Sequence, residues 1–276
     1  MIEIVKAILF GIVEGITEWL PVSSTGHLIL LDEFIKLKIS PEFSEMFEVV
    51  IQLGAILAVI VLFFHKLNPL SPKKDDLQKK STWSLWLKVV AAVIPSAVLG
   101  VAMELLELDD VLYHYAVVAI ALIVYGVAFI FLEKRSGAEK IDDVYAIDYK
   151  TALLIGAFQC LSLIPGTSRS GSTILGAIML GVARPAGAEF SFFLAIPTML
   201  GASALKTLEF LLSGVTATAT ELGVLAVGCV VSFVVSVLVI KVLMDYVRRH
   251  SFAVFGWYRI VLGVLVLGYF AISAMV

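Results

Sequence analysis

The sequence predicts an all-α polytopic membrane protein that forms one integral membrane domain over residues 1–276. Hydrophobic residues make up 60% of the chain and charged residues only 16%, whereas soluble globular chains have roughly 45–50% and about 25%. So large an apolar excess does not fit a soluble enzyme, a disordered chain or a fibrous repeat. The formal net charge of −3 offers no basic field, so we expect no nucleic-acid partner.

Several stretches have the roughly 20 apolar residues that a bilayer-spanning helix needs. The expected spans lie at about 45–65, 84–106, 112–132, 186–212, 222–244 and 253–275. The N-terminal stretch opens with the acidic Glu3 and lacks a small-residue cleavage site. We therefore do not expect it to be a cleavable signal peptide.

Two further apolar segments, 4–35 and 151–182, are interrupted by Pro, Gly and hydroxyl residues. The interruptions read LPVSSTGH at 20–27 and IPGTSRSGST at 164–173. Non-helical backbone at membrane depth is tolerated only where protein or water covers it. Both segments are therefore expected to form re-entrant helix hairpins.

The order of elements repeats, because a hairpin and three spans over about 1–135 are followed by the same series over about 150–276. Corresponding positions are Gly11 and Gly156, Glu14 and Gln159, Pro21 and Pro165, Ser24 and Ser168, and Glu48 and Glu189. Three spans are an odd number, so the second repeat must have inverted topology. Inverted repeats with broken helices place a ligand site at their interface near the midplane, where we expect the two hairpin tips to meet.

Loop charges predict the orientation, since cytoplasmic loops carry an excess of Lys and Arg. Basic residues gather after the span that ends near 65, in the loop 133–150 and in the turn after 244, whereas 107–111 and 213–220 have none. The basic loops are expected in the cytoplasm. Both termini and the first hairpin then lie on the outer side, and the second hairpin enters from the cytoplasm.

Glu14 and Glu18 lie four residues apart, so they share one helix face. Two carboxylates that close in a low dielectric need a proton or a bridging cation. Mg²⁺ or Ca²⁺ is the expected cation, because both prefer oxygen ligands. The alternative is a carboxylate pair that faces a water-filled cavity and binds no ligand.

The first interruption contains a possible nucleophile and base. Ser24 precedes His27 by three residues, a spacing that lets the imidazole approach the hydroxyl on a first helical turn. Ser23 or Ser24 can cap the next half-helix, whose free amides attract an anion. The expected substrate contacts here are Ser23, Thr25 and Gly26. In the plain alternative, the serines only cap the helix, and His27 is a core histidine whose hydrogen bonds are satisfied by its neighbours.

The second interruption contains Arg169 between Ser168 and Ser170. A guanidinium, helix amides and hydroxyls together form a phosphate cradle, whereas the plain alternative is an arginine that snorkels to the interface. One half of the chain thus supplies acid–base and metal groups, and the other supplies the phosphate clamp. This division favours a single catalytic site.

With these motifs in view, the chain resembles the BacA-type undecaprenyl-diphosphate phosphatases of bacterial cell-envelope synthesis. The resemblance is carried by EGITEWLPVSSTGH at 14–27, FEVVIQLG at 47–54, PGTSRSGST at 165–173 and EFSFFLAIP at 189–197. It implies a metal-dependent phosphatase of the bacterial cytoplasmic membrane that converts a C55 polyprenyl diphosphate to the monophosphate and phosphate. It also implies lipid-carrier recycling for peptidoglycan synthesis and a link to bacitracin resistance. We expect membrane lipid as a partner and allow for a homodimer.

Our mechanistic hypothesis is that Ser24 attacks the terminal phosphorus and forms a transient phosphoseryl enzyme, while His27 exchanges the proton. Glu18 assists or holds the metal with Glu14, and Arg169 stabilises the transferring group. In a variant, His27 activates water directly and no covalent step occurs.

A second class of function stays open, because broken helices and inverted repeats also describe secondary transporters and lipid flippases. In that class the acid pair and His27 would relay a proton or cation, and Arg169 would anchor a headgroup. A structural scaffold ranks last, because it leaves the ionisable cluster without a purpose.

Overall fold

The computed structural model describes residues 1–106, 112, 114–135 and 140–273, and within these ranges it contains helices and loops but no strand. Six of its helical segments are long and apolar enough to cross a membrane. They are α3 with α4 (Pro41–Val50 and Gln52–Leu62), α6 (Asp76–Leu105), α8 (Tyr115–Arg135), α11 (Arg184–Leu212), α12 (Ala219–Val247) and α13 (Ala253–Ser273). All six predicted spans are thus confirmed as long apolar helices, while the predicted loop at 107–111 lies outside the described residues.

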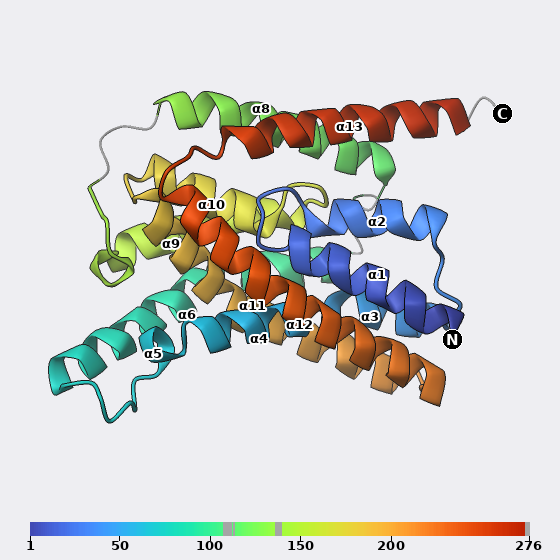
Figure 1. Ribbon diagram of the computed structural model, residues 1–276, viewed down its shortest axis with the longest axis horizontal. Coiled ribbons are helices and arrows are strands. Elements are labelled where there is room, and N and C mark those ends of the chain that lie inside the picture. The colour runs from blue at the N-terminus through green and yellow to red at the C-terminus, as the bar shows by residue number, and fades with distance from the viewer. Residues whose placement is uncertain (107–111, 113, 136–139, 274–276) are drawn as a thin grey trace.

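The two interrupted segments each form two helices with a non-helical break. The first gives α1 (Ile2–Thr17) and α2 (Ser24–Phe34), and the second gives α9 (Tyr149–Gln159), the 3₁₀ turn η2 (Cys160–Leu163) and α10 (Arg169–Met179). In Figure 1, α1 and α2 extend from the centre to the right-hand end, whereas α9 and α10 lie on the left. The short elements α5 (Phe64–Leu67) and η1 (Val144–Ala146) belong to the loops between helices.

A serine caps the helix after each break. Ser23 and Ser168 have φ angles of 74° and 75°, in the left-handed region that non-glycine residues seldom adopt. Their hydroxyls accept hydrogen bonds from the backbone N–H groups of Gly26 and Gly171. The caps satisfy amides that the helix cannot pair internally, and they fix the direction in which α2 and α10 leave the breaks.

Glycines bring the interrupted segments close to long helices. α1 packs on α12, with Gly11 against the carbonyl of Gly228 and Gly15 against that of Ser232. α9 packs on α6, where Gly156 lies directly against the Ala92 carbonyl. Small residues let membrane helices approach at backbone distance, so both breaks are held inside the bundle and not at its lipid-facing surface.

The packing at Gly156 generates a stability prediction. An added Cβ there would overlap the Ala92 carbonyl oxygen, so we expect Gly156→Ala to lower the free energy of unfolding by about 1–3 kcal/mol. Gly201→Ala is the matched control, since a Cβ at Gly201 meets nothing within 4 Å and alanine favours a helix. The thermal midpoint of purified protein in detergent should fall only for Gly156→Ala. Equal midpoints for the two variants would contradict the close approach of α9 and α6.

Candidate active site

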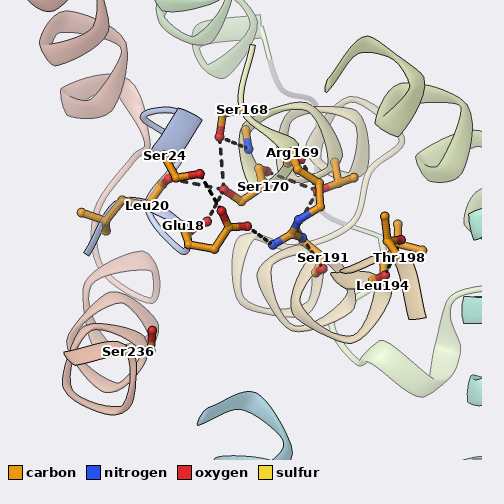
Figure 2. Close-up of polar contacts among 12 residues, drawn as sticks. Glu18, Leu20, Ser24, Ser168, Arg169, Ser170, Ser191, Leu194, Thr198 and Ser236 are labelled. Carbon is orange, nitrogen blue, oxygen red and sulfur yellow. Dashed lines mark hydrogen bonds and ion pairs between the residues drawn. The ribbon is translucent and has the colours of Figure 1, made fainter. Parts of the chain in front are cut away.

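A carboxylate joins the two breaks at the centre of the bundle. The Ser24 hydroxyl donates to Glu18 Oε2 over 2.6 Å, and Arg169 Nη2 donates to Glu18 Oε1 over 2.9 Å. Figure 2 shows Glu18 between the two partners. The side chains of Arg169 and Glu18 are 9% and 5% exposed, so the ion pair is shielded from solvent. Buried partners hold each other far more firmly than an exposed pair would.

A second contact joins the same breaks through Ser170. Its hydroxyl lies 3.0 Å from the carbonyl oxygen of Glu18 and 3.3 Å from that of Leu20, as a donor to both, and Ser168 Oγ lies 3.2 Å from Ser170 Oγ (Figure 2). The first turn of α10 therefore packs directly on the break between α1 and α2. The two breaks are therefore in direct contact.

Arg169 keeps donor capacity beyond this pair. Its Nη1 donates to the Ser191 carbonyl over 2.9 Å, and its guanidinium lies over the Trp19 ring at 5.7 Å from the centroid. Within the described part of the chain, Arg169 Nε and Trp19 Nε1 are buried without a hydrogen-bond partner. Both are N–H donors of the kind that phosphate oxygens accept.

Glu14 is fully buried, and neither carboxylate oxygen has a hydrogen-bond partner among the described residues. It interacts electrostatically with Glu18 and Arg169. The described residues contain no cluster of three or more His, Cys, Asp or Glu that could enclose a metal by themselves. A pair of carboxylates nevertheless fits Mg²⁺, which is bound through one or two carboxylates together with phosphate oxygens of a substrate.

His27 lies elsewhere than the sequence analysis expects. Its Nδ1 lies 2.7 Å from the Ser23 carbonyl, and its Nε2 lies 2.6 Å from the hydroxyl of Tyr258, whose ring stacks on the imidazole. Because a carbonyl only accepts, Nδ1 carries the proton, and in the neutral ring Nε2 accepts from Tyr258. No hydrogen bond between His27 and Ser24 occurs among the described residues. The helix turns the imidazole toward α13, and Ser24 has Glu18 as its acceptor instead.

The remaining predicted contacts surround this centre. Ser23 is buried as the cap of α2, Gly26 is buried in its first turn, and Thr25 is half-buried.

Gln159, which corresponds to Glu14 in the second half, donates to Ser96 Oγ over 2.6 Å and to Thr198 Oγ1 over 3.2 Å. The second half therefore has a neutral polar network where the first half has an acid.

Sequence reasoning missed two residues of α13. Besides Tyr258, the fully buried Arg259 donates to the Pro21 carbonyl over 3.1 Å and to the Gly166 and Thr167 carbonyls over 2.8 Å each. A signal was present, because Arg259 is an ionisable residue inside an apolar span, and such residues are functional candidates by default.

The assembled groups are suited to nucleophilic chemistry on an anion. A hydroxyl donates to a carboxylate that can take its proton. A guanidinium lies beside this carboxylate, where it can stabilise negative charge.

Comparison with known proteins gives a concordant result over nearly the whole chain. The family model described as "Bacitracin resistance protein BacA" matches residues 7–265. Undecaprenyl-diphosphatase 1 of Clostridioides difficile is 60% identical, with 98% of this chain and 97% of that protein covered. The undecaprenyl-diphosphatases of Enterococcus faecalis and Lactiplantibacillus plantarum are each 56% identical, and 97% or more of each chain is covered.

Proposed function

This chain belongs to the BacA family, and we propose that it is an undecaprenyl-diphosphatase. It hydrolyses the C55 polyprenyl diphosphate to the monophosphate and phosphate, in the bacterial cytoplasmic membrane. The monophosphate is the lipid carrier that peptidoglycan synthesis reuses, and removal of the diphosphate lipid that bacitracin sequesters confers resistance. The observation that carries the proposal is the buried series Ser24, Glu18 and Arg169.

In the first step, Ser24 Oγ attacks the terminal phosphorus, and its proton moves to Glu18 Oε2, which already accepts the hydroxyl hydrogen bond. The bond from phosphorus to the bridging oxygen breaks, and the polyprenyl monophosphate leaves with the electron pair. The product is a phosphoseryl enzyme. Glu18, and not His27, is thus the base for Ser24, because the 2.6 Å contact joins Ser24 to the carboxylate.

Arg169 changes partner during this step. The terminal phosphate competes with Glu18 for the guanidinium, so substrate binding leaves Glu18 free to accept the Ser24 proton. Arg169, the indole N–H of Trp19 and the amides at the start of α10 then stabilise the charge on the transferring group.

In the second step, water attacks phosphorus, the bond to Ser24 Oγ breaks, and Oγ regains a proton from Glu18. His27, whose Nδ1 is held by the Ser23 carbonyl, gives up the hydrogen bond from the Tyr258 hydroxyl and accepts at Nε2 the proton that the attacking water loses. In the alternative without a covalent intermediate, water attacks the substrate directly and Ser24 only orients it.

A divalent cation, Mg²⁺ or Ca²⁺, completes the site at Glu14 and Glu18. The support is Glu14, whose two buried oxygens have no partner among the described residues. When bound, the cation neutralises phosphate charge as a Lewis acid. Glu14 and Glu18 would hold the cation, and Glu18 keeps its role as acceptor of the Ser24 hydroxyl.

The fold is a pair of inverted-topology repeats, each with a re-entrant hairpin. Reciprocal packing supports this assignment, since α1 of the first half packs on α12 of the second, and α9 of the second packs on α6 of the first. The two caps also correspond, because Ser23 and Ser168 share a left-handed φ and accept from the glycine three residues later.

The site opens to the outer side of the membrane. The loop between α5 and α6, the segment before η1 and the turn between α12 and α13 lie in the left half of Figure 1, opposite the N-terminus. These segments contain Lys73, Lys140 and Arg248. Because cytoplasmic loops carry an excess of Lys and Arg, we place this end of the bundle in the cytoplasm. The outer end also carries lysines, but Lys6 and Lys206 form ion pairs with Glu3 and with Glu104 and Glu209.

Phosphate release in detergent tests the proposed activity. We expect purified protein to release phosphate from polyprenyl diphosphate with Mg²⁺. Ser24→Ala should lower kcat by at least ~10³-fold, because loss of the nucleophile also removes the benefit of the groups that act with it. Ser203→Ala, a buried serine that bonds the Val49 carbonyl, should retain activity. Acid-quenched reactions with substrate labelled in the terminal phosphate should leave label on wild type but not on Ser24→Ala.

Two results would contradict this account. Near-normal turnover by Ser24→Ala would exclude Ser24 as the nucleophile. No phosphate release by wild type, together with lipid translocation in proteoliposomes, would favour the transporter or flippase.

The metal assignment predicts a selective change in metal dependence. Glu14→Gln should raise the Mg²⁺ concentration for half-maximal activity at least ~10-fold, because a ligand oxygen is replaced by a weaker neutral donor. Glu104→Gln is the control, since this carboxylate belongs to a partly exposed pair with Lys206. An unchanged Mg²⁺ requirement in Glu14→Gln, or full activity of wild type in EDTA, would show that Glu14 does not bind the cation.

The orientation predicts which cysteines an impermeant maleimide reaches in intact cells. In a background with Cys160→Ser and Cys229→Ser, we expect Thr216→Cys to react and Lys73→Cys to react only after permeabilisation, since both positions are exposed. Labelling of Lys73→Cys in intact cells would reverse the orientation.

A further inference from the structure

Arg259 of α13 binds both breaks at once. Its Nη1 donates to the Pro21 carbonyl in the first break, and its Nη2 donates to the Gly166 and Thr167 carbonyls in the second. The side chain is fully buried. One guanidinium therefore fixes the distance between two segments that are more than a hundred residues apart in sequence.

The chemistry of this contact requires arginine. The three acceptors are carbonyl oxygens at 2.8–3.1 Å, which the planar fork of a guanidinium can reach together, whereas a lysine ammonium has neither the plane nor the span. Within the described residues Arg259 has no carboxylate partner, and only the Tyr125 ring lies under it, at 5.7 Å. Arg259 is thus not one half of an ordinary buried ion pair.

The place of the guanidinium ties it to the reacting groups. Pro21 lies three residues before Ser24, and Thr167 lies two residues before Arg169. A Cβ built on Gly171 would be 3.2 Å from Arg259 Nη1, so the guanidinium also contacts the first turn of α10. A shift of Arg259 would move the two helix starts relative to each other, and with them the partners of Glu18.

We propose that Arg259 is a positioning residue for the hydrolysis, which locks the two breaks in the arrangement that brings Ser24 and Glu18 to Arg169. It acts through the backbone of the breaks and touches neither the substrate nor the reacting atoms. The inference rests on the proposed function, because its effect is measured on turnover of polyprenyl diphosphate. The same contacts explain why a lone cation is retained inside an apolar helix.

The test compares Arg259→Lys, which keeps the charge, with Arg259→Gln, which loses it. Both lose the three-carbonyl fork, so both should lower kcat at least ~30-fold with KM within about threefold, as expected when reacting groups are misplaced by about an ångström. Arg249→Lys is the matched control, since Arg249 is exposed in the turn before α13, and its kinetics should equal those of wild type. Kinetics are normalised to folded protein by size-exclusion profile and thermal midpoint in detergent.

Each other outcome overturns the positioning role. Wild-type kcat in either folded Arg259 variant shows that the fork is dispensable. A raised KM in Arg259→Gln that Arg259→Lys restores shows direct substrate binding by the charge. Failure of both variants to fold, or a loss that follows the folded fraction alone, shows a role in folding only. Inactive wild-type protein would instead reject the proposed function, which the same assay reports separately.

Discussion

The structure depends on one constraint, that non-helical backbone and ionised side chains far from water must find their partners within the protein. The chain meets this constraint by making its two breaks satisfy each other. Glu18 of the first break pairs with Arg169 of the second, and Ser170 of the second donates to the Glu18 and Leu20 carbonyls of the first. Each buried break depends on the other for these partners, and the same contact brings Ser24, Glu18 and Arg169 together.

The sequence predicts the long apolar helices and the two breaks well, because both are local signals. Apolar length identifies α6 and α12, and Pro with hydroxyl residues identifies the break before Ser24. The partners of side chains are less local. From the sequence, a spacing of three residues permits His27 to face Ser24. In the structure, the ring instead binds the Ser23 carbonyl and the hydroxyl of Tyr258, which lies more than two hundred residues away in the sequence. Such a contact depends on how α13 packs, which no short motif encodes.

The two halves use a common backbone device for different chemistry. Ser23 and Ser168 both adopt a left-handed φ and cap the helix that follows. This backbone conformation is strained for a non-glycine residue, so it persists only where the surrounding structure enforces it. After the cap, the first half has Ser24 and the second has Arg169. The Ser23 hydroxyl accepts an amide hydrogen bond, which engages one of its two lone pairs in capping. In the proposed mechanism, Ser23 caps the helix and its neighbour Ser24 is the nucleophile.

A buried pair of Glu18 and Arg169 also explains how the site stays intact without substrate. A lone guanidinium or carboxylate that is buried in this way would cost several kcal/mol, so each stabilises the other until a phosphate competes for the guanidinium. A diphosphate brings more negative charge than one carboxylate, and it can displace Glu18 from Arg169 only if other positive groups balance that carboxylate and Glu14. This requirement is the physical argument for the proposed divalent cation beside Glu14 and Glu18, where Arg169 is already paired with a carboxylate.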